Sequence, residues 1–158
     1  MQYNFKKSLF PLLLLSLLLS FSCNNNSNYY NGMISSAHPI ASKIGLDILK
    51  NGGSAFDAAI AVHIALSVVY PNAGNIGGGG FLVYRLNNGD IGTLDFREKA
   101  PEKSYRDMYI DSIEGELKVD DKRSKFGHLA SGVPGSVDGM VKIYDKFSTV
   151  DWIDLLEP

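Results

Sequence analysis

Apolar residues begin to recur with a helical period just after residue 38, which predicts the first helix of the chain. Lysines and an aspartate lie opposite a face of small and apolar residues, which are Ile40, Ala41, Ile44, Gly45 and Ile48. Pro39 suits the first helical position, because its missing N–H needs no partner there. Gly52 and Gly53 tolerate the left-handed backbone that ends many helices. Residues 32–37 can form a short strand ahead of this helix.

The same kind of pattern predicts two more helices. Ser54 and Asp57 form a variant capping box, and residues 58–69 are apolar around nearly the whole circumference. A helix with that pattern is buried on most sides. The turn at 132–135 most simply sets the geometry of the next helix, whose apolar stripe is Val137, Met140, Val141, Tyr144 and Phe147. Residues 151–157 predict the first turns of another helix.

Two strands are predicted between these helices. Residues 81–86 are apolar with little alternation, which is typical of a strand covered on both faces. The Asn88-Gly89 pair is a strong signal for a two-residue hairpin turn into residues 91–97. In this second strand Leu94 and Phe96 share one face, and the other face carries Ile91, Thr93, Asp95 and Arg97. Helices beside an antiparallel pair indicate an α+β fold.

Residues 102–125 carry many charges and show no sustained period. We interpret them as an irregular excursion with one helical turn near residues 105–110.

Four consecutive glycines precede the first strand: Gly77, Gly78, Gly79 and Gly80. A phosphate-binding loop needs a following Lys-Ser/Thr pair, and a dinucleotide site needs a helix after the glycines. A strand follows here, so the pattern disfavours nucleotide binding. Because glycine lacks Cβ, the run predicts close approach of the backbone to other backbone or to a ligand.

The glycine run and the second strand end belong to a longer motif. Residues 71–81 read PNAGNIGGGGF and residues 95–101 read DFREKAP, and both resemble the large-subunit core of the γ-glutamyltransferases. Two further stretches are similar to the same family, KNGGSAFDAAIA at 50–61 and HLASGVPG at 128–135. The resemblance covers residues 32–158.

The resemblance implies a fold and an activity. The fold is part of an αββα sandwich of the N-terminal nucleophile hydrolase type, truncated, with unpaired strand edges and part of an apolar layer exposed. The activity is transfer of a γ-glutamyl group, from glutathione or other γ-glutamyl compounds, to water or an amino acid without any cofactor. The family's nucleophile is a threonine that self-cleavage places at the start of a small subunit. Thr93 and Thr149 fit no such cleavage motif. We therefore expect this chain to be the first part of such an enzyme, inactive alone, with its small subunit in a missing C-terminal half.

The resemblance also implies a site residue. Arg97 would hold the α-carboxylate of the γ-glutamyl group, because a guanidinium offers two parallel N–H donors. Asp95 and Glu98 are expected to support the other edge of the guanidinium, and the loop of Gly77, Gly78, Gly79 and Gly80 is expected to pack near the pocket. Without the resemblance, a structural ion pair of Arg97 with one of these carboxylates is the favoured interpretation. Another acylase of the superfamily fits the arginine motif less well.

Composition excludes some classes of function. The 158 residues are 45% hydrophobic and 20% charged, which is ordinary for one globular domain. The net charge of −2 becomes −4 when residues 1–22, with Lys6 and Lys7, are removed, and no basic cluster remains, so we expect no nucleic-acid binding. The three histidines, His38, His63 and His128, show no metal-ligand spacing, and no serine lies in a Gly-x-Ser-x-Gly elbow. We interpret His63 as a core residue.

The first residues predict export. Residues 9–21 form an apolar run after two lysines that is too short for a membrane-spanning helix of roughly 20 residues but suits a secretory signal. Cys23 follows a small serine and resembles the acylation site of a bacterial lipoprotein, although Ser20 occupies the usual leucine position. We expect a signal peptide over 1–22, a polar tether over 23–31, and a lipid anchor on the periplasmic or cell-surface side of an envelope membrane. Ordinary signal cleavage, an uncleaved anchor, and a non-enzymatic lipoprotein or inactive remnant are the alternatives.

Overall fold

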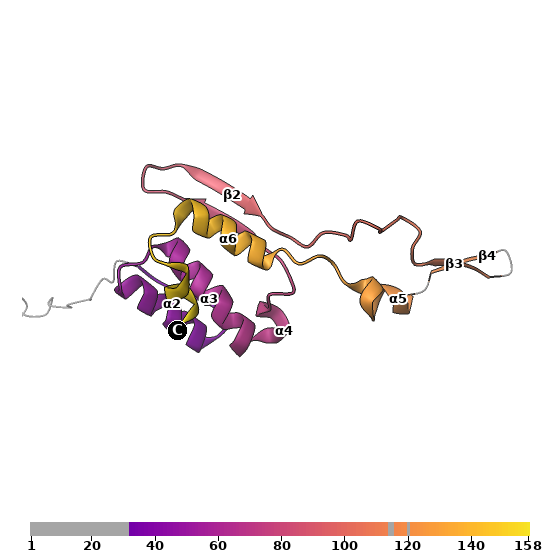
Figure 1. Ribbon diagram of the computed structural model, residues 1–158, viewed down its shortest axis with the longest axis horizontal. Coiled ribbons are helices and arrows are strands. Elements are labelled where there is room, and N and C mark those ends of the chain that lie inside the picture. The colour runs from indigo at the N-terminus through magenta and orange to yellow at the C-terminus, as the bar shows by residue number, and fades with distance from the viewer. Residues whose placement is uncertain (1–31, 114–115, 120) are drawn as a thin grey trace, which may run out of the picture. The chain divides into compact units, whose positions relative to one another are not determined.

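The computed structural model describes residues 32–113, 116–119 and 121–158 of the chain (Figure 1). Contacts group residues 32–158 into one unit. The predicted signal peptide, Cys23 and the tether lie outside the described residues. The segment 32–37, for which we predict a strand, is not in regular secondary structure, and a bend at residues 37–38 leads into the first described helix.

Two helices that lie side by side begin the fold, α2 (Pro39–Lys50) and α3 (Ala55–Val69). Pro39 occupies the predicted first position, and the N–H of Ile40 donates to His38 Nδ1 at 3.3 Å. Gly52 follows the helix with φ 94°, as predicted from its sequence position. The capping box of Ser54 and Asp57 is also confirmed, with both of its hydrogen bonds present.

The buried part of α3 is narrower than the sequence predicts. Ala58, Ile60 and Ala61 are buried, whereas Val68 is 75% exposed. The short helix α4 (Pro71–Gly74) follows α3 directly. The prediction of burial on most sides is therefore wrong for this part of the chain, where α2, α4, α6 and α7 cover only part of α3.

The predicted hairpin is present as β1 (Phe81–Arg85) and β2 (Ile91–Asp95), paired antiparallel from Phe81 opposite Asp95 to Arg85 opposite Ile91. Its turn is one residue longer than predicted. The N–H of Gly89 donates to Leu86 O at 2.9 Å, and Leu86 N–H donates to Asp90 O at 2.8 Å. Gly89 lies at φ 95°, so it is the left-handed residue of a three-residue loop.

Only one face of this hairpin is covered. Leu82, Leu94 and Phe96 pack against the core, whereas Phe81 and Val83 are 65% and 74% exposed. The prediction that residues 81–86 are covered on both faces is therefore wrong among the described residues. The predicted alternation of the second strand is confirmed, because Phe96 is buried and Arg97 is exposed.

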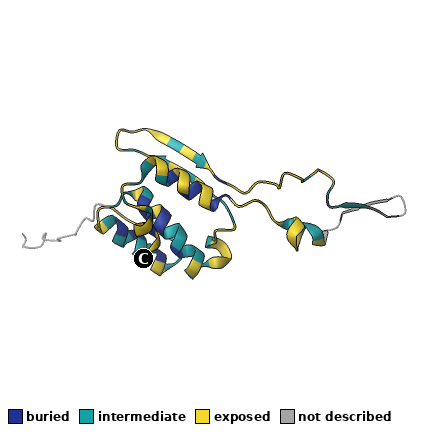
Figure 2. Ribbon diagram, in the orientation of Figure 1, coloured by how far each residue is buried: buried dark blue, intermediate teal, exposed yellow. Residues whose placement is uncertain are grey.

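The helix α6 (Ser136–Phe147) lies against the covered face of the hairpin, and α7 (Trp152–Leu156) follows it. Its buried residues are Ser136, Gly139, Met140 and Ile143. Of the predicted stripe, Met140 is buried and Tyr144 and Phe147 pack against the core, whereas Val137 and Val141 are 47% and 41% exposed. The buried face extends instead toward Gly139, which lies on the ring of Phe96, where a Cβ would come within 2.3 Å of Cγ. Figure 2 shows the buried residues concentrated on the helices, while the hairpin is largely exposed or intermediate.

The excursion at 102–125 is more regular than predicted. It contains a second antiparallel hairpin, β3 (Ile110–Ile113) with β4 (Glu116–Val119), and a short helix α5 (Asp121–Lys125). A 3-10 turn η2 (His128–Ala130) leads back toward α6. Strands of four residues are too short to reveal a period among so many charged residues, which explains why the pattern misses them.

Asp57 links two segments of the folded unit that are far apart in the sequence. Its carboxylate is fully buried and accepts from the N–H of Ser54 at 2.7 Å, the hydroxyl of Ser148, and both the N–H and hydroxyl of Thr149. Burial alone would raise the pKa of Asp57, but the hydrogen bonds from Ser148, Ser54 and Thr149 outweigh it and lower the pKa below 3.8. The start of α3 is thereby tied to the connection between α6 and α7.

Candidate functional site

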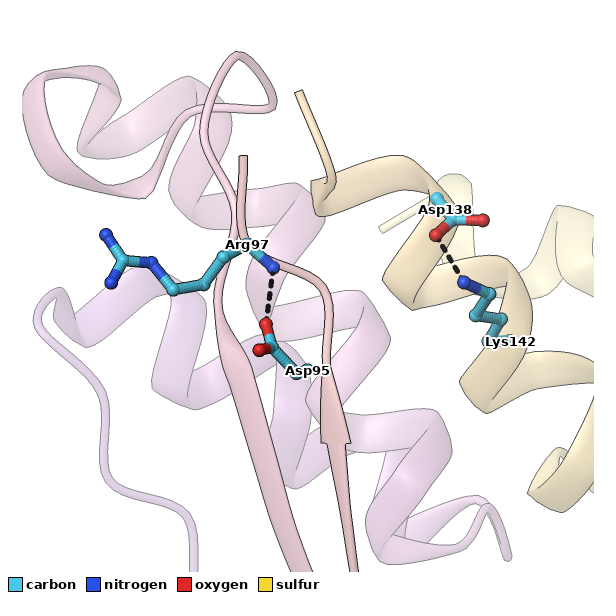
Figure 3. A network of polar contacts seen from close by, with 4 residues as sticks. All are labelled: Asp95, Arg97, Asp138 and Lys142. Carbon is cyan, nitrogen blue, oxygen red and sulfur yellow. Dashed lines mark hydrogen bonds and ion pairs between the residues drawn. The ribbon is translucent and has the colours of Figure 1, made fainter. Parts of the chain in front are cut away.

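Arg97 lies two residues beyond the end of β2, with its side chain directed away from Asp95 (Figure 3). The side chain is 64% exposed. Its guanidinium carbon is 5.6 Å from the centroid of the Phe81 ring, and Nε is 4.0 Å from Glu98 Oε2, the outer limit of an ion pair. Among the described residues the guanidinium donates no hydrogen bond, so its paired N–H groups are available to a ligand.

Asp95 has a different partner from the one we predict. Its Oδ1 accepts the backbone N–H of Arg97 at 2.9 Å, and Figure 3 shows the guanidinium pointing away from this carboxylate. The ion pair in that view, Asp138 with Lys142 at 2.6 Å, lies on α6. Of the two expected supporting carboxylates, only Glu98 comes near the guanidinium.

The backbone on either side of Arg97 is held by two separate pairs of hydrogen bonds. Before it, Phe96 N–H donates to Gly80 O at 3.0 Å and Gly80 N–H donates to Phe96 O at 3.4 Å. After it, Lys99 and Val133 exchange N–H to C=O bonds at 3.1 and 2.8 Å. Arg97 is therefore an exposed cation on an anchored backbone segment.

The glycine loop approaches this segment closely. A Cβ on Gly79 would lie 2.6 Å from Phe96 O and 2.7 Å from Arg97 Cα, and a Cβ on Gly80 would lie 2.8 Å from the Phe96 ring. The predicted approach of backbone to backbone is confirmed at Gly79. Gly77 and Gly78 are less constrained, because their Cβ atoms would meet side-chain oxygens at 3.1 and 3.3 Å.

The turn at 132–135 contacts the same segment from another direction. A Cβ on Gly135 would lie 1.9 Å from Phe96 O. Gly78 O accepts the N–H groups of Gly135 and Ser136 at 2.8 and 3.0 Å, so the glycine loop caps the start of α6. We interpret this turn from sequence only as a helix-setting element. Its glycine-rich composition was the available signal for the tight packing that the structure reveals.

A cavity of about 560 Å³ lies beside the segment that follows Arg97. Its lining includes Glu98, Lys99, Tyr105, Tyr109 and Ser131. The hydroxyl of Tyr109 donates to Leu129 O at 2.7 Å across one side of it. The cavity is large enough for a small ligand, although Arg97 itself does not line it.

The sequence profile described as Gamma-glutamyltranspeptidase matches residues 41–158. The chain belongs to the γ-glutamyltranspeptidase family. It is 46% identical over 127 residues to the glutathione hydrolase proenzyme of Escherichia coli K12, a match that covers 80% of this chain and 21% of the relative. It is 49% identical over 128 residues to the glutathione hydrolase proenzyme of Pseudomonas sp. strain A14, covering 81% of this chain and 22% of the relative. The chain thus spans about a fifth of the length of these relatives.

Solved structures of the family share this fold. The γ-glutamyltranspeptidase of Helicobacter pylori is 50% identical with a TM-score of 0.76, and the match covers 80% of this chain and 36% of that one. The γ-glutamyltranspeptidase of Pseudomonas nitroreducens complexed with L-DON is 40% identical with a TM-score of 0.75, covering 80% and 37%. The mixed helix and strand fold is therefore that of a γ-glutamyltranspeptidase segment.

Within residues 32–113, 116–119 and 121–158, no group of His, Cys, Asp or Glu side chains is arranged to hold a metal ion. The described helices include none that is both long enough and apolar enough to cross a membrane. His63 is half-buried on α3, and burial lowers its pKa below the ordinary 6.5, so it is neutral at pH 7.

The contacts of the glycine loop predict a difference between two neighbouring glycines of this γ-glutamyltranspeptidase segment. Gly79→Ala forces backbone to move, so we expect it to lower the free energy of unfolding by roughly 1–3 kcal/mol. The atom nearest to the new Cβ in Gly78→Ala is Glu98 Oε1 at 3.3 Å, at the end of a flexible side chain, so we expect a change within about 1 kcal/mol of the parent. Urea denaturation of the three proteins measures this, and equal losses for both variants would contradict the contacts described for Gly79.

Proposed function

We propose that this chain is part of a γ-glutamyltransferase, or glutathione hydrolase, and that Arg97 binds the α-carboxylate of the γ-glutamyl group. One observation carries the proposal: in a member of the γ-glutamyltranspeptidase family, a largely exposed guanidinium projects from a backbone segment that is fixed on both sides. A planar guanidinium with two free parallel N–H groups matches a carboxylate in a bidentate manner. A single arginine can thereby fix both the position and the orientation of an amino-acid group.

The reaction in this proposal is acyl transfer. A threonine hydroxyl, activated by its own free α-amine, attacks the γ-glutamyl amide, and water or an amino acid then accepts the acyl group. This nucleophile would come from a small subunit, because Thr149 donates its hydroxyl to the buried Asp57 at 2.7 Å and Thr93 lies within β2. The proposed substrates are glutathione or other γ-glutamyl compounds, and the proposed partner is that small subunit.

The proposal also assigns a role to the uncovered face of the hairpin. Phe81, Val83 and Ile91 are between 65% and 74% exposed on one side of β1 and β2. We propose that a second layer of an αββα sandwich covers them in the complete enzyme. An exposed apolar face of this kind otherwise favours aggregation.

A chimera tests the proposed activity. Residues 32–158 of this chain would replace the matching stretch of the Helicobacter pylori γ-glutamyltranspeptidase, and cleavage of γ-glutamyl-p-nitroanilide would be measured. Because this stretch is proposed to supply the carboxylate site, we expect kcat/KM within roughly tenfold of the parent enzyme. A folded and proteolytically processed chimera without cleavage would refute the proposal.

We further propose that residues 1–22 direct export and that acylated Cys23 anchors the protein to a bacterial envelope membrane, with residues 23–31 as a tether. The proposal rests on the two lysines, the apolar run and the small residue before the cysteine. Cys23→Ser should move the protein from the membrane fraction to the soluble fraction of a bacterial host, while Ser22→Ala should not. Failure of labelled fatty acid to enter the parent protein would contradict the proposed anchor.

A further inference from the structure

Asp95 is the last residue of β2, and its carboxylate accepts a hydrogen bond from a backbone N–H and not from a cationic side chain. Its Oδ1 accepts the N–H of Arg97 at 2.9 Å, two residues further on. Asp and Asn form this local turn readily, because their short side chains reach the backbone N–H two positions later. Among the described residues Asp95 makes no ion pair, although it lies within two residues of an arginine.

The Arg97 N–H needs such an acceptor because the sheet does not reach it. The last hydrogen-bonded pair of the hairpin is formed by Phe96 and Gly80, and the next backbone pair begins at Lys99 with Val133. Between these two backbone pairs, the Asp95 carboxylate accepts the hydrogen bond of the Arg97 backbone N–H. It therefore helps to set the direction in which the Arg97 side chain leaves the backbone.

The guanidinium is directed away from this carboxylate. It lies over the Phe81 ring at 5.6 Å, its closest acidic neighbour is Glu98 at 4.0 Å, and Figure 3 shows it on the far side of the strand from Asp95. A carboxylate bonded to the guanidinium would compete with a bound substrate carboxylate. Asp95 avoids this competition, because it acts on the backbone.

We propose that Asp95 is a positioning residue for Arg97, acting as a backbone hydrogen-bond acceptor and not as a counter-ion. This inference rests on the proposed function, in which Arg97 binds the substrate carboxylate. It predicts that the oxygen atom of residue 95 matters and its charge does not. Asparagine keeps the oxygen and removes the charge, whereas alanine removes both.

The test compares Asp95→Asn, Asp95→Ala and Arg97→Ala in the active chimera. We expect Asp95→Ala to raise KM for γ-glutamyl-p-nitroanilide about tenfold with little change in kcat, a split that marks lost substrate binding. Asp95→Asn should restore KM to within roughly threefold of the parent. Equal KM increases for the asparagine and alanine variants would overturn the inference in favour of a charge role. A raised KM for Arg97→Ala with no change for Asp95→Ala would overturn it while leaving the proposed function in place.

A second measurement does not depend on catalysis. Amide hydrogen exchange at Arg97 in the full chain should be slow in the parent and in Asp95→Asn, and faster by about tenfold in Asp95→Ala, because only alanine removes the acceptor. Exchange at the amide of Phe96, which donates to Gly80 O, serves as the internal reference. Identical exchange at Arg97 in all three proteins would show that the hydrogen bond is not formed and would overturn the inference.

Discussion

Arg97→Ala should raise the KM of the chimeric enzyme for γ-glutamyl-p-nitroanilide by roughly 30-fold to several thousand-fold, equivalent to about 2–5 kcal/mol of substrate affinity. The substrate carboxylate would lose two charge-assisted hydrogen bonds, each contributing about 1.5–3 kcal/mol. Because the carboxylate does not take part in bond breaking, its contact is present in both the ground state and the transition state. The loss should therefore appear mainly in KM, with kcat changed much less.

Two variants sharpen this experiment. Arg97→Lys should recover only part of the affinity, because an ammonium cannot reproduce the parallel pair of donors. Arg85→Ala removes another exposed arginine, at the opposite end of the same hairpin, and should leave KM near that of the parent. An unchanged KM for Arg97→Ala in a folded enzyme would remove Arg97 from the substrate site.

Asp57→Asn should lower the free energy of unfolding by about 2–4 kcal/mol, because hydrogen bonds to a charged group contribute about 1.5–3 kcal/mol each. Both oxygens of the Asp57 carboxylate act as acceptors, and two of their donors are the backbone N–H groups of Ser54 and Thr149. The amide nitrogen of asparagine is itself a donor, so it cannot replace an oxygen facing an N–H. Urea denaturation at pH 7 measures the loss.

The matched control is Asp138→Asn, on the exposed surface of α6. Its partner Lys142 is at 2.6 Å, but both side chains are more than half exposed. An exposed ion pair of this kind contributes about 0–1 kcal/mol, so the control should be nearly neutral. Equal losses for the two variants would contradict the structural role of Asp57.

The same carboxylate predicts a dependence of stability on pH. The pKa of Asp57 is lowered on folding, so the stabilisation is complete above its unfolded value of 3.8 and is lost as the pH falls toward the lower folded value. The difference between the parent and Asp57→Asn should therefore shrink below about pH 4. A difference that stays constant from pH 7 to pH 3 would show that the charge of Asp57 does not stabilise the fold.

Local sequence signals predict the elements whose ends carry a distinctive residue. Pro39 marks the start of α2, Gly52 its end, and Ser54 with Asp57 the start of α3, and all are found where predicted. Each of these signals depends on contacts within about four residues. For that reason a single sequence is enough to identify them.

Contacts between distant segments could not be predicted in this way. The bonds from Ser148 and Thr149 to Asp57 join residues 91 and 92 positions apart, and a capping box has the same sequence with or without them. The four glycines of the loop also look alike in the sequence. Only the position of the Phe96 and Arg97 backbone distinguishes Gly79, which contacts it, from Gly78.

In the candidate site, too, local features could be predicted from the sequence and contacts between distant residues could not. The two-residue period of the second strand places Arg97 at a strand end on the face opposite Phe96, and the structure has it exposed there. Our prediction for the partner of Asp95 is wrong, because an arginine two residues away offers two donors, its guanidinium and its backbone N–H. In the structure the guanidinium lies over the ring of Phe81, 16 positions away in the chain, and the backbone N–H bonds to Asp95, and local sequence does not show that contact with Phe81.

Removing the carboxylate from the substrate, together with the arginine from the enzyme, tests the central claim most directly. The chimera and its Arg97→Ala variant would each be assayed with γ-glutamyl-p-nitroanilide and with 4-aminobutanoyl-p-nitroanilide, which lacks only the α-carboxylate. If Arg97 binds that group, the parent should prefer the first substrate in kcat/KM by about 30-fold or more, and Arg97→Ala should lose most of this preference. A preference that is equally large in both enzymes would show that another group binds the carboxylate and would contradict the function proposed for this chain.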